Sequence, residues 1–290
     1  MVVVFSVIFP KNLLFFPSFL ISLENQTNKN FKLILFNDGV VNLDRYFKDS
    51  SLNIESYNVN NMSPFEIRLY GLEKVSEMGA DYIIFADTDD LMTSERVASS
   101  VYYLKKYPFV CNDISIISKE GKLMVDLFWE QRITNKFEFG IKFIKNQNLI
   151  GLGNSAMQGN QLNKILNTLV GHSTGSDWLF FSAAENHLHA VFVTECCTLY
   201  RQHDNNIIGK KEINSASLFS MINKKIEHYN SLKRINFNSY AVDEQIELNQ
   251  NILQMCKADP YFYDNQIKKI NLLGINFFWW EESNYINLAQ

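Results

Sequence analysis

The chain has 290 residues, which corresponds to one large domain or to one domain with an extension. Hydrophobic residues make up 47% of the chain and charged residues 20%, a composition that is typical of a globular protein and argues against disorder. The net charge of −4 gives no support for a nucleic-acid partner, which usually requires a basic face, so we expect none. The four cysteines show neither metal-site spacing nor a disulfide pattern, which predicts buried thiols in a reducing compartment.

Two apolar segments near the N-terminus, residues 2–9 and 13–23, have the hydrophobicity of a signal peptide. No basic segment precedes them, Pro10, Lys11 and Asn12 interrupt the run, and no small-residue cleavage site follows. Neither segment reaches the roughly 20 residues that span a bilayer. We therefore expect a cytoplasmic protein with a buried first strand.

Apolar runs alternate with helical patterns over the first hundred residues. Strands are predicted at residues 2–9, 31–36, 53–57 and 82–86, and helices at residues 13–23, 63–79 and 94–106. Asn12 is expected to cap the first helix, Ser63 the second, and Thr93 or Ser94 the third. This alternation predicts an α/β fold, in which helices cover both faces of a mostly parallel sheet.

The pattern is less regular in the rest of the chain. Strands are predicted at residues 109–118, 122–127, 190–193 and 198–200, and helices near 137–147, 159–169 and 176–186. Polar amphipathic helices are predicted from residue 212 onward, with an apolar stripe at helical spacing formed by Leu218, Ile222, Ile226 and Tyr229.

Acidic turns follow two of the predicted strands, with Asp38 in the first turn and Asp87, Asp89 and Asp90 in the second. Ligands of an open parallel sheet bind at the carboxyl ends of its strands. Three acidic residues within four positions repel one another, and a hard divalent cation such as Mg²⁺ or Mn²⁺ relieves that repulsion. The alternative is a solvated loop in which Asp90 caps the next helix.

Several short motifs occur in a fixed order over residues 3–209: residues 6–12, Asn37 to Gly39, Arg68, residues 81–90, Gly151 with Asn154 and Ser155, residues 176–181, and Tyr200 to His203 with Asn206. In this order they resemble glycosyltransferase family 2, in particular its bacterial members that build cell-surface polysaccharides. The resemblance implies the GT-A fold, a Rossmann-like α/β sheet. It also implies inverting, metal-dependent transfer of a sugar from a nucleoside diphosphate to a glycan or lipid-linked glycan acceptor.

The resemblance also implies a role for each matching residue. Asp38 would contact a uracil or thymine base, and Asp87 the ribose. Asp87 and Asp89 would hold Mn²⁺ or Mg²⁺, and His203 would be a further metal ligand or a phosphate contact. Asp177 would be the general base that deprotonates the acceptor hydroxyl. The same nucleotide site would include Pro10, Asn12, Arg68 and Thr88.

The chain departs from the family's pattern at three places. Asn37 stands where the family usually has Asp, and Ser176 where it usually has Glu. The loop from Pro10 to Asn12 is one residue shorter than usual and lacks its aromatic residue. The replacement at Ser176 leaves the implied catalytic carboxylate, Asp177, in place.

The resemblance predicts a catalytic domain over residues 1–210, with a nucleotide-binding half (1–107) and an acceptor half (108–210). Residues 211–290 would form a C-terminal helical extension. Residues 210–234 carry six Lys and Arg against two Glu, so a helix there could bind anionic lipid at the inner face of the membrane.

Other functions remain open at the level of sequence. One is a nucleotidyltransferase on a related α/β sheet, and another is a non-catalytic sugar-binding or scaffold protein of the same fold. The segment from Gly151 to Ala156 has the spacing of a dinucleotide fingerprint, but it lacks the preceding strand and the acid about 20 residues later. His187 and His189 could present two imidazoles on one face, although polar residues at a strand start explain them as well.

Overall fold

The computed structural model describes residues 1–145, 147–202, 214–235, 237 and 242–272. The chain divides into two compact units. Unit 1 consists of Met1–Ile141 and Leu149–Arg201, and unit 2 of Lys142–Asn148 and Gln202–Gln290.

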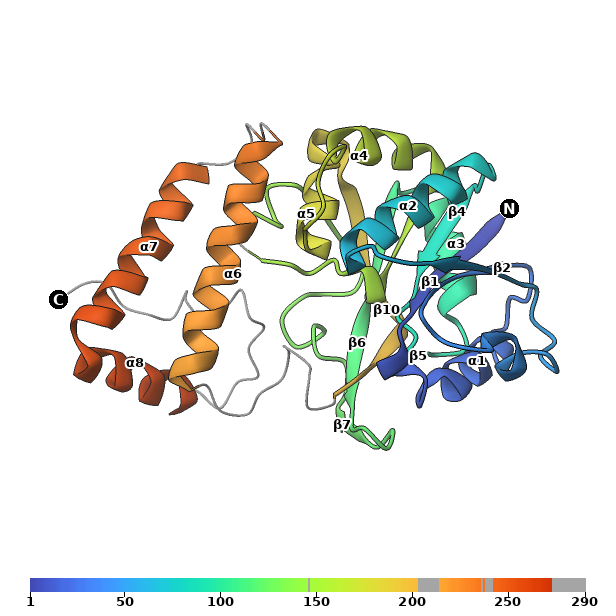
Figure 1. The fold of residues 1–290 in the computed structure, drawn as a ribbon, viewed down its shortest axis with the longest axis horizontal. Helices are drawn as coiled ribbons and strands as arrows, with labels where there is room; N and C mark the ends of the chain where they lie inside the picture. The colour runs from blue at the N-terminus through green and yellow to red at the C-terminus, as the bar shows by residue number, and fades with distance from the viewer. Residues whose placement is uncertain (146, 203–213, 236, 238–241, 273–290) are drawn as a thin grey trace. The chain divides into compact units, whose positions relative to one another are not determined.

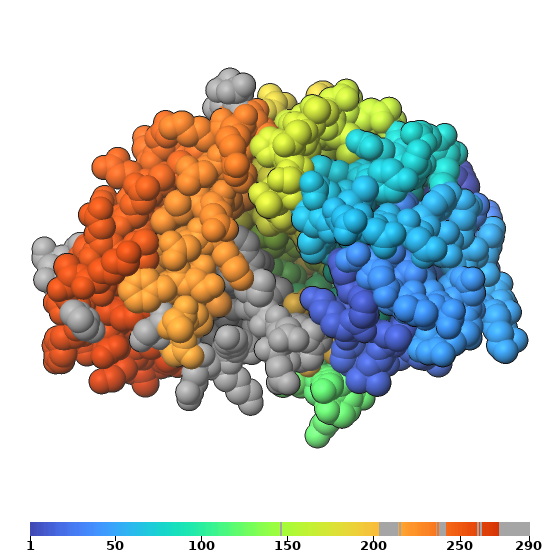
Figure 2. All heavy atoms as spheres, viewed as in Figure 1, coloured from blue at the N-terminus to red at the C-terminus, as the bar shows by residue number. Residues whose placement is uncertain are grey.

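Ten strands in the described part of unit 1 form one sheet, in the order β3-β2-β1-β4-β9-β6-β10-β5, with β7 paired to β6 and β8 to β10 (Figure 1). The strands are β1 (Val2–Ile8), β2 (Lys32–Asp38), β3 (Ile54–Val59), β4 (Tyr82–Phe85), β5 (Leu91–Met92), β6 (Phe109–Ile117), β7 (Leu123–Val125), β8 (Phe137–Gly140), β9 (Ser155–Gln158) and β10 (His189–Arg201). The turn between β6 and β7 projects from unit 1 as the green atoms at the lower edge of Figure 2.

The sheet is mixed, and its parallel part carries the N-terminal half of unit 1. β1 pairs in parallel with β2 and β4, and β2 pairs in parallel with β3. β9 then runs antiparallel between β4 and β6, while β6 and β10 are parallel. The parallel part therefore brings the carboxyl ends of β1, β2 and β4 to one edge.

Helices cover both faces of this sheet, as predicted (Figure 1). Those of unit 1 are α1 (Phe16–Glu24), α2 (Pro64–Glu77), α3 (Arg96–Leu104), α4 (Leu162–Thr168) and α5 (Asp177–Ser182). α1 and α3 share one apolar cluster with the β1 residues Val4 and Ile8. On the other face α2 approaches so closely that a Cβ on Gly71 would lie 2.8 Å from the rings of Phe5 and Phe36. The α5 residues Phe180 and Phe181 pack edge-on against Phe85.

The predicted start of α2 is confirmed. Ser63 Oγ accepts the amide of Glu66, and the Glu66 carboxylate accepts the amide of Ser63, so the two residues form a reciprocal capping box. Gly79, in the left-handed region at φ +66°, follows the end of the helix. All four cysteines are buried free thiols, also as predicted.

Two predicted helix starts are wrong. Asn12 does not cap α1, because it ends a short 3₁₀ turn (Pro10–Asn12), and α1 begins only at Phe16. α3 has Glu95 at its N-cap position, without a side-chain cap, and neither Thr93 nor Ser94 serves.

The strand and helix assignments of the later chain also need correction. The helix predicted near residues 137–147 begins instead with β8, which pairs with β10. Residues 190–193 and 198–200 belong to a single strand, β10, with a register irregularity between Val193 and Cys197. In both places long-range pairing decides the local conformation, which periodicity in a short window does not report.

Unit 2 contains α6 (Ser215–Arg234), α7 (Val242–Ala258) and α8 (Pro260–Leu272). Their shared core is formed by Leu218, Ile222, Ile252, Cys256, Tyr263, Ile267 and Ile270. The predicted apolar stripe of α6 is confirmed, because Leu218, Ile222 and Tyr229 are fully buried and Ile226 packs beside them. Among the described residues, no helix combines the length and the apolar character needed to cross a membrane.

Candidate active site

The acidic turn after β4 is fixed to the neighbouring strand β1. The Ala86 amide donates to the Phe5 carbonyl at 3.1 Å, and Ser6 Oγ donates to the Ala86 carbonyl at 2.9 Å. Thr88 is fully buried, and its Oγ1 donates to the Val7 carbonyl at 3.0 Å. The Thr88 hydroxyl is therefore used inside the fold, where it holds the turn at the carboxyl edge.

Asp90 anchors the other end of this turn. It is buried, and its Oδ1 accepts the backbone amide of Arg201 at 2.8 Å. The Arg201 side chain donates to the Asp89 carbonyl at 2.8 Å. Burial raises the pKa of Asp90 well above its usual range, and the charges of Asp89 and Asp87 raise it further. Asp90 is thus an internal tie between the turn and β10, which rules out a solvated loop with Asp90 as the cap of α3.

Asp87 faces the open side of the edge, with 36% of its side chain exposed. Arg68 Nη2 of α2 lies 3.7 Å from Asp87 Oδ1, and Arg68 Nη1 also donates to the Pro64 carbonyl. Partial burial of the carboxylate raises the pKa of Asp87 to about 6. The positive charge of Arg68 opposes this shift, and the negative charges of Asp89 and Asp177 add to it. The carboxylates of Asp87, Asp89 and Asp177 therefore lie close enough for their charges to interact.

A glycine loop (residues 151–154) passes between Asp87 and Asp177. The Leu152 amide donates to Asp177 Oδ2 at 3.0 Å. A Cβ on Gly153 would lie 2.8 Å from Asp87 Oδ2, so bare backbone occupies this position. Asp177 is the first residue of α5, and Ser176 caps that helix by accepting the Leu179 amide. The loop whose spacing matched a dinucleotide fingerprint thus supports a carboxylate instead.

Asn37 closes the turn that carries Asp38. Its Nδ2 donates to the Val40 carbonyl at 2.9 Å and to Asn58 Oδ1 at 2.8 Å, while its Oδ1 accepts the Val40 amide at 2.8 Å. An amide can donate and accept at once, which an ionised Asp cannot, so this departure from the family's pattern has a structural reason. Asp38 is the last residue of β2 and is partly exposed.

The remaining predicted residues differ in their surroundings. Pro10 is exposed, and its ring lies close to Gly39, where a Cβ would be 3.8 Å away. Asn12 is buried, and its Oδ1 has no hydrogen-bond partner within the described chain. The predicted metal ligand His203 lies outside the described residues.

Two buried arginines were missed by sequence reasoning as parts of this site. Arg201 belongs to the Tyr200–His203 motif, so its position in the motif was the available signal. Arg96 is fully buried at the start of α3 and gave no signal, because nothing in the sequence distinguishes it from a surface arginine.

Asp87 and Asp89 could hold a metal ion together with further ligands, such as the phosphates of a bound substrate. Within the ranges that the structure describes, no group of three or more His, Cys, Asp or Glu side chains is arranged as a metal site. Mg²⁺ is commonly held by one or two carboxylates together with substrate phosphates. Asp87 and Asp89, two residues apart in the acidic turn, are suited to that arrangement.

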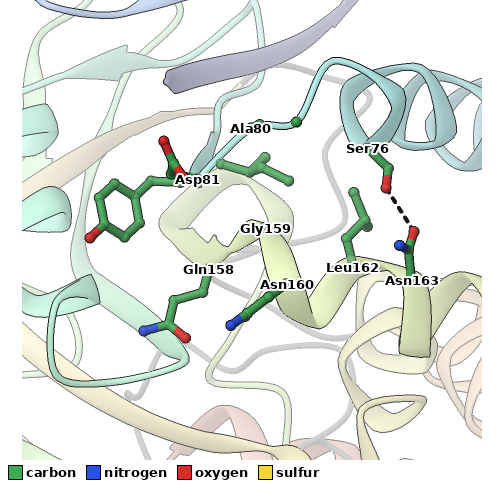
Figure 3. A pocket seen from close by; sticks show the side chains of 11 residues that line it. Ser76, Ala80, Asp81, Gln158, Gly159, Asn160, Leu162 and Asn163 are labelled. Carbon is green, nitrogen blue, oxygen red and sulfur yellow. Dashed lines mark hydrogen bonds between the residues drawn. The ribbon is translucent and has the colours of Figure 1, made fainter.

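A separate cavity of about 560 Å³ lies at the other end of β4. Figure 3 shows that Asp81, Gln158 and Asn160 border it, with a hydrogen bond from Ser76 to Asn163 at one side. Its lining residues on β4 are at the start of the strand, whereas Asp87 follows the end. The cavity is therefore not part of the carboxylate site.

No protein-family model and no curated protein matches the sequence. Among solved structures, S. aureus TarS 1-349 in complex with UDP-GlcNAc aligns with 84% of this chain and 70% of that chain, with a TM-score of 0.59 and 11% identity. GalNAc-T7 with UDP, GalNAc and Mn²⁺ aligns with 70% of this chain and 44% of that chain, with a TM-score of 0.53 and 12% identity. This protein therefore has the GT-A fold of these glycosyltransferases.

Proposed function

We propose that this protein is an inverting, metal-dependent glycosyltransferase that moves a sugar from a UDP- or dTDP-sugar to a glycan or glycolipid acceptor, in surface polysaccharide biosynthesis. One observation carries the proposal: Asp87 and Asp177, from distant parts of the chain, flank a single glycine loop at the carboxyl edge of the sheet. The GT-A fold and its UDP-bound structural neighbours support it.

In the proposed reaction Asp177 acts as the general base. The proton of the acceptor hydroxyl passes to the Asp177 carboxylate, while the acceptor oxygen bonds to the anomeric carbon and the bond to the diphosphate oxygen breaks. This single displacement inverts the anomeric configuration. The hydrogen bond from the Leu152 amide orients the Asp177 carboxylate for this transfer.

The other carboxylates bind and orient the donor. Asp38 contacts the base, and Asp87 the ribose, with Pro10, Asn12, Arg68 and the backbone of Thr88 around the nucleotide. Asp87 and Asp89 hold Mn²⁺ or Mg²⁺, with His203 as a further ligand or phosphate contact. The bound cation would stabilise the negative charge that develops on the diphosphate leaving group.

The two competing functions, a nucleotidyltransferase and a scaffold protein, can be distinguished from a glycosyltransferase. A nucleotidyltransferase would need a glycine-rich, basic loop there to hold a triphosphate. The chain instead has the Pro10–Asn12 turn, with Lys11 as its one cation. A scaffold protein would bind a donor without turnover. Nucleotide release measured across UDP- and dTDP-sugars, with Mn²⁺ or Mg²⁺, tests the proposal, and binding without release from any donor would favour the scaffold.

We assign the catalytic domain to residues 1–210, with donor and acceptor halves that meet at residues 107 and 108, and a helical extension to residues 211–290. Peripheral membrane association through α6 would serve a lipid-linked acceptor. Lys225 of α6 is buried, whereas Lys233 and Arg234 are exposed, so the last turn of α6 would face the lipid.

Asp38→Ala is expected to weaken UDP binding by about 10-fold or more, because a hydrogen bond to a charged group is worth roughly 1.5–3 kcal/mol. Calorimetry with UDP and ADP measures the effect. Asp44→Ala is the matched control, since Asp44 is exposed in the next turn of the chain. Unchanged UDP affinity, or tighter binding of ADP than of UDP by the wild type, would contradict the assignment of the base site.

Metal-dependent donor binding is expected to weaken as the pH falls from 7 to 5. The pKa of Asp87 is raised to about 6, so Asp87 becomes protonated in this window, whereas an ordinary Asp stays ionised. Because a metal needs the ionised carboxylate, the proton competes with it. Calorimetry with a UDP-sugar, whose diphosphate does not titrate here, measures this dependence, and the same titration in chelator is the control. A flat profile in the presence of metal would remove Asp87 from the ligands.

A further inference from the structure

Arg96 joins four separate segments of unit 1 beneath the glycine loop. Its side chain is fully buried. Nη1 donates to the Gly153 carbonyl at 3.0 Å and to Thr198 Oγ1 at 2.7 Å. Nη2 donates to the Phe85 carbonyl at 3.0 Å and to the Ser155 carbonyl at 3.2 Å. One guanidinium thus connects the end of β4, the glycine loop, β9 and β10.

A second set of hydrogen bonds holds the same loop. Thr198 Oγ1 donates to the Gly153 carbonyl at 3.0 Å and accepts Asn112 Nδ2 at 3.0 Å. Asn154 Nδ2 donates to the Asn112 carbonyl at 2.9 Å, and Asn154 Oδ1 accepts the Gly151 amide at 2.8 Å. The Gly153 carbonyl therefore receives two donors, and the loop is tied to β10 through Gly153 and to β6 through Asn154.

The opposite side of the loop meets the proposed reaction centre. The Leu152 amide binds Asp177 Oδ2, and Gly153 leaves no room for a side chain beside Asp87 Oδ2. A shift of the loop would therefore move the contact to Asp177, the contact to Asp87, or both. Phe85, another Arg96 partner, lies two residues before Asp87, so the same guanidinium also fixes the strand that carries the first carboxylate.

We propose that Arg96 is a positioning residue for glycosyl transfer: its guanidinium fixes the glycine loop against β4 and thereby sets the placement of Asp177 relative to Asp87. This inference rests on the proposed function. The planar, forked guanidinium reaches acceptors in several directions at once, which a lysine ammonium on a flexible stem cannot reproduce. A displacement of about 1 Å in a reacting group can cost about 10²-fold in rate, so small loop shifts matter.

Two variants test the inference, one by changing Arg96 and one by changing its partner. Arg96→Lys keeps the positive charge and removes the forked guanidinium. Thr198→Val is nearly isosteric and removes only the hydroxyl that binds Arg96 and the Gly153 carbonyl. Gln26→Met is the matched control, because Gln26 is fully buried and bonds to Ser22, Thr93 and Val97 beside the start of α3, without touching the loop.

For Arg96→Lys and Thr198→Val we expect kcat to fall by about 10-fold or more, toward the 10²-fold scale of a misplaced group. The donor KM and the UDP-sugar Kd should change much less than kcat, because the hydrogen bond from the loop goes to Asp177, the proposed base, whereas only the Gly153 backbone approaches Asp87. Amide hydrogen exchange of the peptide covering residues 149–156 should speed up in both variants. Gln26→Met should lower the melting temperature and leave both kcat per folded molecule and this exchange unchanged.

The measurements of kcat and of loop hydrogen exchange distinguish failure of this inference from failure of the proposed function. Wild-type kcat and unaltered loop exchange in both loop variants would overturn the role of Arg96. The same conclusion would follow if Gln26→Met reduced kcat and speeded loop exchange as strongly, because general destabilisation would then explain the effect. Absence of wild-type turnover with any donor would overturn the proposed function, and unaltered loop exchange in the variants would then overturn the inference independently.

Discussion

Asp177→Asn is expected to reduce glycosyl transfer by about 10²–10⁴-fold, the usual cost of removing a general base. Donor and metal binding should remain close to wild type. The substitution is nearly isosteric, and the amide oxygen of Asn can still accept the Leu152 amide that binds Asp177 Oδ2. The glycine loop should therefore keep its position, and only the ability to take a proton is lost.

Nucleotide release under saturating donor measures the rate, and calorimetry with a UDP-sugar and Mn²⁺ measures binding. Asp81→Asn is the control, because Asp81 is an exposed carboxylate at the other end of β4. A variant that transfers sugar at the wild-type rate would show that another residue is the base. Loss of donor binding in parallel with the rate would show that Asp177 holds the donor instead.

Asp89→Ala is expected to remove most of the metal-linked affinity for a nucleoside diphosphate. Even a change outside the ligand shell costs about 10–100-fold in metal affinity, and a lost ligand should cost at least as much. The Asp89 carbonyl that accepts the Arg201 side chain is retained in Ala, so this tie between the turn and β10 should survive the substitution. Asp90→Ala, by contrast, would leave the buried Arg201 amide without its acceptor.

Calorimetry measures UDP binding once with Mn²⁺ and once with chelator. The difference between the two binding free energies is the contribution of the metal. For the wild type this difference should be large, and for Asp89→Ala it should nearly vanish. Asp81→Asn should keep the wild-type difference. If chelator has no effect on the wild type, the metal role of the acidic turn is wrong, whatever the variant does.

Local sequence patterns determined where the proposed donor site lies. The mostly apolar run of β1 predicts a strand buried on both faces, and the strands before Asp38 and Asp87 are equally clear. Because these strands are parallel, their carboxyl ends share an edge, and register places Ile8 beside Asn37. The capping box at Ser63 is likewise readable, since its partners are three residues apart.

Local sequence patterns did not predict the later strands β8 and β10 correctly. The local pattern predicts a helix where β8 forms, and it predicts two strands where β10 is a single strand. β8 exists because β10 offers it a hydrogen-bonding edge, and the irregularity after Val193 depends on the pairing of β10 with β6. Strand formation of this kind depends on partners that are distant in the sequence, so no short window contains the information.

The tertiary structure alone decided what surrounds the carboxylates. The sequence offered the glycine loop as a weak dinucleotide pattern, and only the fold brings Leu152 to Asp177, 25 residues away. Arg96 reaches Gly153 and Thr198 across 57 and 102 residues, and Asp90 meets Arg201 across 111. Residue types that are ordinary along the chain acquire roles here through burial, because a buried charge must find partners wherever the fold supplies them.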